Sequence, residues 1–312
     1  MAAAGDAIYV WRSPAHGGTP IDIAAAEQLA RFAQSEGISR VFYDNYGDGS
    51  QNQSSGRQTR ETLADILTIF NDAGLQTEAL YTDSGHIENV LEYNTSVSEA
   101  ARFSGIRLNY ENSFKGTSPD ERREPTTTGD IAFYQDAVQR AGSLPVYASI
   151  SFHWDEPIQI DGVSRPAFQH IIDVVAGIDV QTAQDSATVI RRLTAEECQY
   201  ATTHNKTCDI TIETADVVRS IGLNDWNTFF EEGPEMMRTS LSEVSTEFPS
   251  VAFAYHFYQG SYGSTDEAVS TWTVETQPFT EAEVVLMMAL SQSVLLAGGA
   301  MLVQRHIARQ PL

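Results

Sequence analysis

The sequence predicts an α/β protein of the (β/α)8 class, a TIM barrel, formed by a single domain of the 312-residue chain. Apolar, β-branched runs alternate with helical patterns, which implies parallel strands joined by crossover helices. The runs number eight, which is the strand count of a closed barrel. The loops after the runs are long and polar, whereas those before them are short. A barrel with its functional face at the carboxyl ends of its strands has this asymmetry.

The eight strand segments are recognised by their content of β-branched, aromatic and other apolar residues. In chain order they cover residues 7–12, 40–45, 76–82, 105–111, 145–152, 178–184, 207–213 and 251–258. The longest polar loops that follow strands are 47–59, 112–129 and 155–165.

Helical patterns occupy the stretches between the strands. They cover residues 23–35, 60–73, 130–141, 167–176, 187–204 and 234–247, and the weakest helical pattern lies within 85–101. Several of these helices are expected to end at glycine, which adopts the left-handed backbone conformation common at helix C-termini. The glycines concerned are Gly37, Gly74, Gly142 and Gly177.

An open, doubly wound parallel sheet is the alternative architecture. Such sheets often carry a glycine-rich, phosphate-binding turn after a strand. None of the eight predicted strands is followed by G-x-G-x-x-G or G-x-x-x-x-G-K-[ST], which favours the closed barrel.

The C-terminal segment 280–312 is expected to complete a barrel whose strands and helices occupy residues 1–279. Residues 284–303 contain no charged side chain and are long enough to cross a bilayer, so a C-terminal membrane anchor is the alternative. A barrel needs a helix after its last strand, and Thr280-Glu-Ala-Glu283 has the early acidic residues of a helix start. We therefore favour a closing helix.

The charge balance narrows the class of partner. The chain carries 42 acidic and 19 basic residues, a formal charge of −23, and Lys115 and Lys206 are its only lysines. Repulsion disfavours nucleic acids and anionic membrane surfaces, whereas a neutral carbohydrate is not repelled. The seven histidines show neither H-x-H nor H-E-x-x-H spacing, so we expect no metal site and no cofactor. The sequence does not indicate an oligomeric state.

Cys198 and Cys208 are the only cysteines, one in a predicted helix and the other in the next strand. Their spacing fits no zinc motif. We favour two buried free thiols, and a disulfide is the alternative in an oxidising compartment. The first residues show no signal peptide, although one could have been removed.

Polar and aromatic residues stand at the ends of the predicted strands, where a barrel brings them to one mouth. They are Trp11, Arg12, Asp44, Asp83, Asn109, Glu111, Trp154, Asp155, Gln184, Asp185, Glu213, His256 and Tyr258. Sugars stack their C–H faces on aromatic rings and hydrogen-bond to carboxylates, amides and imidazoles. Glycoside cleavage further requires two carboxyl groups, and the fourth and seventh strands lie roughly opposite each other.

Each candidate also has a structural interpretation. Glu213 could be a purely structural acid that bonds to backbone N–H groups or to an arginine such as Arg12. Glu111 could form a local polar cluster with Asn109 on the same strand. Asp185 could be the N-cap of the next helix and His256 a hydrogen-bonded core residue. Trp11 and Trp154 could serve in packing instead of as sugar platforms.

Several segments resemble a group of largely uncharacterised, often secreted (β/α)8 proteins related to glycoside hydrolases. Residues 102–112 read Arg-Phe-Ser-Gly-Ile-Arg-Leu-Asn-Tyr-Glu-Asn, where the group has R-F-D-G-I-H-L-D-x-E-P. The similarity extends to 79–85, 90–94, 170–185, 212–214, 229–233 and 252–258, within about residues 79 to 262. It implies a secreted or cell-surface location and site residues at Glu111, Asp185, Glu213, His256 and Tyr258.

The sequence departs from the group's pattern at three positions. Asn109 replaces the first acid of D-x-E, Asn112 replaces the proline, and Gln184 replaces the basic residue before Asp185. Loss of the first acid removes one like-charged neighbour that would raise the pKa of Glu111.

The resulting hypothesis is a glycoside hydrolase that acts on a poly- or oligosaccharide. By analogy, Glu111 is the general acid/base and Glu213 the nucleophile or stabilising carboxylate. The expected substrate-binding residues are Asn109, Asp185, His256, Tyr258, Trp154 and Trp11. The alternative is a non-catalytic surface or assembly protein that keeps the barrel as a carbohydrate-binding or structural module.

Overall fold

The structure is a computed structural model of the chain. It describes residues 5–11, 21–44, 59–110, 128–216 and 224–256, and the backbone of 260–262 and 266–268. The chain divides into two compact units, 1–272 and 273–312. The second unit lies outside the described residues, and so does the predicted segment 280–312 with its uncharged stretch. No helix in the described ranges has the length and apolar character needed to cross a membrane.

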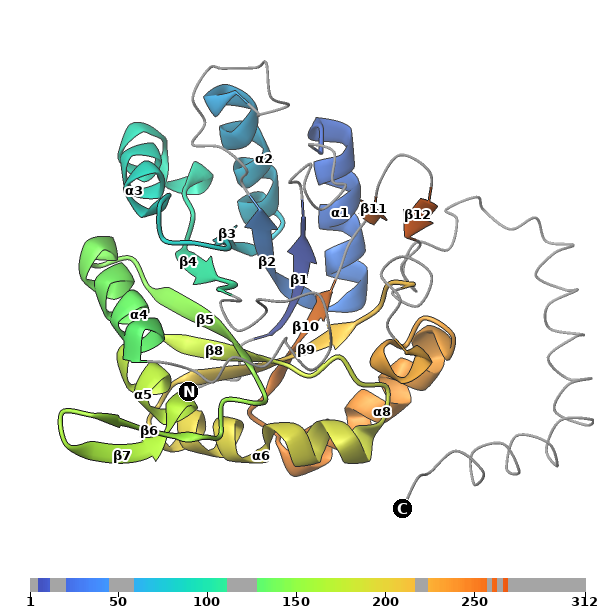
Figure 1. Ribbon diagram of the computed structural model, residues 1–312. Coiled ribbons are helices and arrows are strands. Elements are labelled where there is room, and N and C mark those ends of the chain that lie inside the picture. The colour runs from blue at the N-terminus through green and yellow to red at the C-terminus, as the bar shows by residue number, and fades with distance from the viewer. Residues whose placement is uncertain are drawn as a thin grey trace, which may run out of the picture. The chain divides into compact units, whose positions relative to one another are not determined.

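Eight parallel strands form a closed barrel in the order β1-β10-β9-β8-β5-β4-β3-β2, which confirms the predicted fold class (Figure 1). Pairing between β1 and β10 closes the ring. The strands are β1 (Asp6–Val10), β2 (Ile38–Asp44), β3 (Gln76–Tyr81), β4 (Gly105–Leu108), β5 (Val146–Ser151), β8 (Gly177–Gln181), β9 (Thr207–Glu213) and β10 (Ala252–His256). Each overlaps one strand predicted from the sequence, and several end up to three residues earlier than predicted.

Helices surround the barrel, as Figure 1 shows. They are α1 (Ile23–Glu36), α2 (Arg60–Asp72), α3 (Ile87–Ser96), α4 (Thr128–Ala141), α5 (Ala167–Val174), α6 (Ala187–Thr203) and α8 (Gly233–Glu247), with the short 3₁₀ helices η3 (Glu99–Ala101) and η4 (Asp225–Asn227). The weak pattern within 85–101 corresponds to α3 and η3. All six helices expected with clear patterns are present.

Three of the four glycines predicted to end helices do so, and the fourth has a different role. Gly37, Gly74 and Gly142 follow helices with φ of 73°, 81° and 63°. Gly177 instead begins β8, three residues after the last residue of α5, and a Cβ there would lie 1.9 Å from Oγ1 of Thr207. The prediction that Gly177 ends a helix was therefore wrong, because close contact between β8 and β9 requires the glycine.

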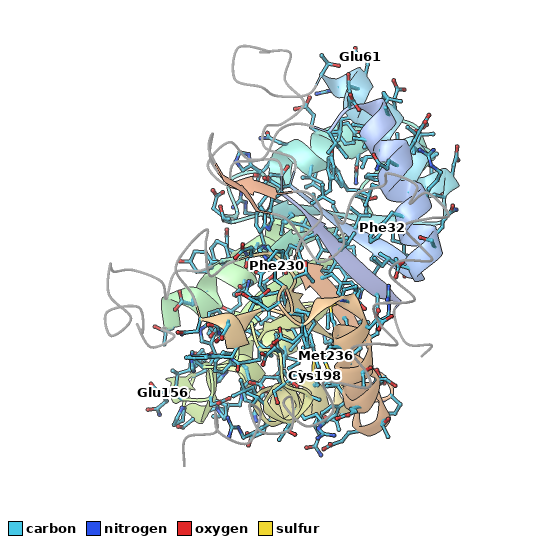
Figure 2. All side chains as sticks on the ribbon, turned by 90° about the vertical axis from the view of Figure 1, so that its right-hand side faces the viewer. Phe32, Glu61, Glu156, Cys198, Phe230 and Met236 are labelled. Carbon is cyan, nitrogen blue, oxygen red and sulfur yellow. A yellow bond between two sulfur atoms is a disulfide. The ribbon has the colours of Figure 1, made fainter. Side chains whose placement is uncertain are left out.

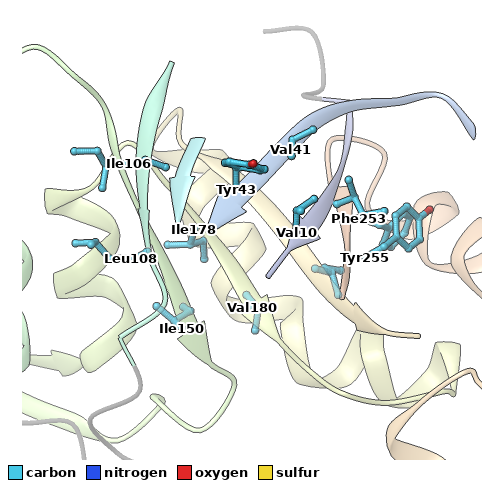
Figure 3. Close-up of a cluster of buried hydrophobic side chains, with 14 of the residues drawn as sticks. Val10, Val41, Tyr43, Ile106, Leu108, Ile150, Ile178, Val180, Phe253 and Tyr255 are labelled. Atoms are coloured by element: carbon cyan, nitrogen blue, oxygen red, sulfur yellow. The ribbon is translucent and has the colours of Figure 1, made fainter. Parts of the chain in front are cut away.

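The outward faces of the strands carry the main hydrophobic core. Successive side chains of a strand point to opposite faces, so every second residue of β1, β4 and β10 faces the helices. Val10, Ile106 and Tyr255 belong to this set and are buried (Figure 3). Burial of such side chains stabilises the fold by about 1.5–3 kcal/mol each.

The inward faces carry a charged cluster beside a second, smaller group of buried apolar residues that includes Tyr9, Phe42 and Leu80. Arg107 is fully buried and bonds to Glu78 (2.7 Å), Asp179 and Asp209 (3.4 Å). Arg40 binds both oxygens of Asp209 at 2.8 and 2.7 Å. Two guanidinium groups thus face three carboxylates in the barrel interior. Removal of one partner from such a cluster would leave a buried charge uncompensated, which typically costs about 3–5 kcal/mol.

A β-hairpin replaces part of the polar loop predicted at 155–165. Strands β6 (Pro157–Ile160) and β7 (Val163–Pro166) pair antiparallel around Asp161 and Gly162, whose φ angles are 50° and 83°. Two central residues with positive φ form the hairpin turn for which Asp-Gly is a strong sequence signal. The loop prediction was wrong at these strands. A second two-stranded sheet joins β11 (Gly260–Tyr262) to β12 (Asp266–Ala268).

Cys198 of α6 and Cys208 of β9 form a disulfide, with their Cα atoms 5.3 Å apart. Figure 2 labels Cys198 among the side chains of this region. The favoured expectation of two free thiols was therefore wrong. The ten-residue separation spans the end of one helix and the start of the next strand, and this geometry brings the two side chains together.

Candidate active site

The carboxyl ends of β4, β8, β9 and β10 bring polar side chains to one end of the barrel. Asn109 follows β4, Gln181 ends β8, Glu213 ends β9 and His256 ends β10. Trp11 follows β1, the neighbour of β10 in the ring. The register of parallel pairing aligns His256 directly with Glu213. Four residues predicted for the site, Trp11, Asn109, Glu213 and His256, thus lie at the same end of the barrel. Gln181 was not among the predicted residues.

Glu213, His256 and Trp11 form one hydrogen-bonded chain. His256 Nδ1 lies 2.7 Å from Glu213 Oε2, and the Trp11 indole N–H donates to His256 Nε2 at 2.6 Å. Glu213 Oε1 accepts two further bonds, from the backbone N–H groups of Thr214 and Ala215, each 2.9 Å long. The carboxylate is thus held in a fixed orientation, 9% exposed.

These contacts define which nitrogen of His256 carries the proton. Because the Trp11 indole can only donate, Nε2 must be the acceptor. Nδ1 then carries the hydrogen and donates it to Glu213. A neutral imidazole with this tautomer satisfies both contacts, whereas a doubly protonated ring would place two donors against each other.

Tyr9 supports the site from within the barrel. Its ring packs edge-on against His256 with centroids 5.3 Å apart and stacks on Trp11 at 6.0 Å. Its hydroxyl group donates to Asp179 at 2.7 Å, and burial raises the pKa of this phenol well above its ordinary value. Tyr9 therefore connects the Trp11–His256 pair to the charged cluster. The sequence reasoning did not identify it, although its place two residues before Trp11 puts it on the same strand face.

Asn109 and Gln181 form a second polar pair, because Gln181 Nε2 donates to Asn109 Oδ1 at 2.8 Å. Gln181 was not among the predicted site residues. The sequence contained one signal for it, since it lies in the predicted strand 178–184, but that strand ends three residues earlier than expected.

Asp185 lies in the loop after β8 and is half-buried. Burial, followed by the nearby negative charges of Glu232, Asp225 and Glu231, raises its pKa to about 7. Its backbone N–H donates to the carbonyl group of Trp226 at 3.1 Å. Asp185 is not the N-cap of α6, because Ser186 holds that position.

The other predicted site residues fall into two groups. Glu111, Tyr258 and Arg12 lie outside the described residues. Trp154 is 5% exposed and belongs to the hydrophobic core between strands and helices. It therefore offers little surface for a ligand. In the described part of the chain, no group of three or more His, Cys, Asp or Glu side chains could hold a metal ion.

Comparison with known proteins supports the fold. The sequence matches no protein-family model, and no curated protein sequence matches it significantly. A GH5_18 protein from Streptomyces cattleya, solved in complex with GlcNAc, is 12% identical with a TM-score of 0.54, over 88% of this chain and 75% of that chain. A GH18 chitinase from Pseudoalteromonas aurantia is 11% identical with a TM-score of 0.48, over 81% of this chain and 94% of that chain. At these identities the likeness shows a (β/α)8 fold, and the first structure carries that conclusion.

Proposed function

We propose that the protein is a glycoside hydrolase that cleaves a poly- or oligosaccharide at the carboxyl end of the barrel. The observation that carries this proposal is the oriented carboxylate of Glu213. It accepts three hydrogen bonds, two from backbone N–H groups and one from His256. Glycosidases require an ionised carboxylate of fixed position beside the sugar's reacting carbon.

The hydrogen-bond pattern assigns different roles to the two oxygens of Glu213. A carboxylate offers about four lone-pair positions. The two backbone donors occupy Oε1, whereas His256 occupies one position on Oε2. Among the described contacts, Oε2 keeps one lone pair that could face a substrate. Oε2 would act either as the nucleophile or by stabilising the positive charge that develops on the sugar ring in the transition state.

Glu111 would supply the second carboxyl group. In the ring, β4, the strand that precedes it in the sequence, is separated from β9 by β8 and β5 on one side. As general acid it would protonate the leaving oxygen, and the expected contribution is about 10²- to 10⁴-fold in rate. A retaining mechanism requires carboxyl groups about 5–5.5 Å apart, whereas inversion requires about 6.5–9.5 Å.

A non-catalytic carbohydrate-binding or structural module is the second candidate. Asn109 favours it, because an amide bonded to Gln181 stands where the related group has an acid. A separation between Glu111 and Glu213 well beyond about 9.5 Å would also favour it.

The test begins with a glycan array and a polysaccharide-digest screen of the wild-type protein. Turnover of the best substrate is then compared in Glu111→Gln and Glu213→Gln, and each variant is expected to lose at least about 10²-fold. Asp185→Asn should change the apparent affinity more than the turnover. If wild type binds a glycan without cleaving it and both glutamine variants bind equally well, the binding module is correct.

Glu213→Gln needs a matched control, because a glutamine whose carbonyl oxygen accepts the two backbone N–H groups turns its NH2 group toward the N–H of His256 Nδ1. Trp11→Phe disrupts the same hydrogen-bonded chain at its other end but leaves the carboxylate in place. We expect Trp11→Phe to retain much more activity than Glu213→Gln at equal thermal stability. Equal losses in the two variants would assign Glu213 a structural role.

A further inference from the structure

Trp226 is an exposed aromatic side chain beside the candidate site. It lies in η4, on the loop between β9 and α8, and is 52% exposed. Its carbonyl group accepts the backbone N–H of Asp185 from the loop after β8. Trp226 therefore lies at the end of the barrel where the strands terminate in Glu213 and Gln181.

The backbone around Trp226 is anchored at both sides. Asn227 donates from Nδ2 to the carbonyl group of Ala183 at 2.8 Å, and the φ of Ala183 is 43°. Thr228 donates from Oγ1 to Ala215 at 2.7 Å, and the Phe229 N–H donates to the carbonyl group of Glu213 at 3.1 Å. These bonds fix the Trp226 segment to the end of the strand that carries the Glu213 carboxylate.

An anchored, half-exposed tryptophan is unusual for a structural residue. A structural tryptophan would bury its ring, because an indole can bury 150–250 Å² of surface. Here several side chains and backbone groups hold the segment while the ring remains in solvent. That arrangement is suited to a ligand that covers a flat apolar surface.

We propose that Trp226 is the aromatic platform of a sugar-binding subsite at the rim between the loops after β8 and β9, and that this subsite takes an uncharged saccharide unit. The proposal rests on the carbohydrate function proposed above and specifies a residue and a substrate class for it. The C–H face of a pyranose ring would cover the indole, while its hydroxyl groups would reach the polar groups of the two loops.

The charge around Trp226 determines the substrate class. Asp225 precedes it and accepts its backbone N–H at 3.0 Å. Glu232, Asp225 and Glu231 lie close to Asp185. Their negative charges add to the effect of burial in raising the pKa of Asp185. A uronate or sulfated sugar would meet this negative field, whereas a neutral sugar would not.

The test measures binding of named saccharides to the full chain and to three variants. The neutral probes are the hexasaccharides of cellulose, xylan, mannan, laminarin and chitin, and the anionic probe is hexagalacturonate. Trp226→Ala should weaken binding of the neutral probe that wild type prefers by at least about 10-fold, as expected for a tryptophan at the centre of a contact. Trp226→Phe should restore much of it. Met236→Ala is the matched control, because Met236 is 53% exposed on α8 and has no proposed role.

Chemical modification provides a second readout that does not depend on cleavage. Limited oxidation with N-bromosuccinimide, followed by peptide mass spectrometry, should modify Trp226 before the buried Trp11 and Trp154. The bound hexasaccharide should protect Trp226 from oxidation.

The outcomes separate this proposal from the proposed function. If wild type binds a neutral hexasaccharide and Trp226→Ala binds it as tightly, the platform is wrong while the carbohydrate function stands. Preferential binding of hexagalacturonate overturns the substrate class. If no probe binds to wild type, both proposals fail.

Discussion

At the residue scale, the hydrogen bonds that join Glu213, His256 and Trp11 depend on the alignment of β9 with β10. The strand-end position of Glu213 and His256 was predictable from the pattern of alternating strands. Their bond to each other, and the indole of Trp11 that fixes the tautomer, required the register between β9 and β10. Trp226 could not be predicted, because a single aromatic residue in a polar loop carries no pattern.

Glu197 illustrates a residue whose environment the sequence does not indicate. It is buried on α6 beside the loop residue Asp155, and the two carboxyl groups share a hydrogen bond. Burial and the negative charges of Asp155 and Glu196 raise the pKa of Glu197 to about 8 from 4.5. Folded Glu197 therefore holds its proton over a pH range in which the unfolded chain releases it.

We predict that this pair makes the protein less stable as pH rises. Between about pH 4.5 and 8 the folded state binds one more proton than the unfolded state, so the free energy of unfolding falls with increasing pH. Glu197→Gln keeps an N–H donor toward Asp155 and removes the titration. Its melting temperature should equal that of wild type near pH 5 and exceed it above pH 8.

Glu196→Gln is the matched control, since Glu196 is the exposed neighbour on the same helix. It should retain most of the wild-type pH dependence. A Glu197→Gln variant whose stability declines with pH as steeply as that of wild type would show that another group titrates.

At the element scale, the eight strands and most helices could be predicted from the sequence. The errors concern the β6–β7 hairpin and the role of Gly177. The β6–β7 hairpin was missed because each of its strands has only four residues and none of these residues is fully buried, so they form no apolar run. Gly177 was misread because a glycine after a helical pattern usually ends the helix. The side chain of Thr207 on the neighbouring strand, which explains this glycine, lies thirty positions further along the chain.

The disulfide between α6 and β9 should stabilise this pair of elements. Closing a loop with a sequence separation of 10 limits the unfolded chain and is worth about 2–3 kcal/mol. In a domain of this size, that corresponds to a fall of about 5–10 °C in melting temperature on reduction. Calorimetry with and without reductant measures the effect.

The double variant Cys198→Ala/Cys208→Ala is the control, and reductant should not change its melting temperature. Alkylation of the unfolded wild-type protein without reductant should label neither cysteine. Labelling of both would contradict the disulfide and restore the free thiols favoured from the sequence.

At the scale of the whole molecule, the barrel was predictable because its signal is distributed over eight strands and their connections. The charged cluster in the barrel interior could not be predicted in the same way. Arg40, Glu78, Arg107, Asp179 and Asp209 come from five different strands, and only the closed ring brings them together. In the sequence, each of them is a single charged residue in or beside an apolar run, and the pairing that neutralises it cannot be read from its neighbours.

The segment 280–312 provides the test at this scale. A (β/α)8 barrel covers the outer face of its last and first strands with the helix that follows the last strand. On β10 and β1 that face carries Phe253, Tyr255 and Val10, all of them buried. If 280–312 supplies this closing helix, as the sequence predicts, its deletion should lower the melting temperature markedly and increase the binding of a hydrophobic dye. A truncated protein that keeps the stability of wild type and becomes more soluble would instead identify 284–303 as a membrane anchor, and partitioning of the full chain into lipid vesicles would then be the positive test.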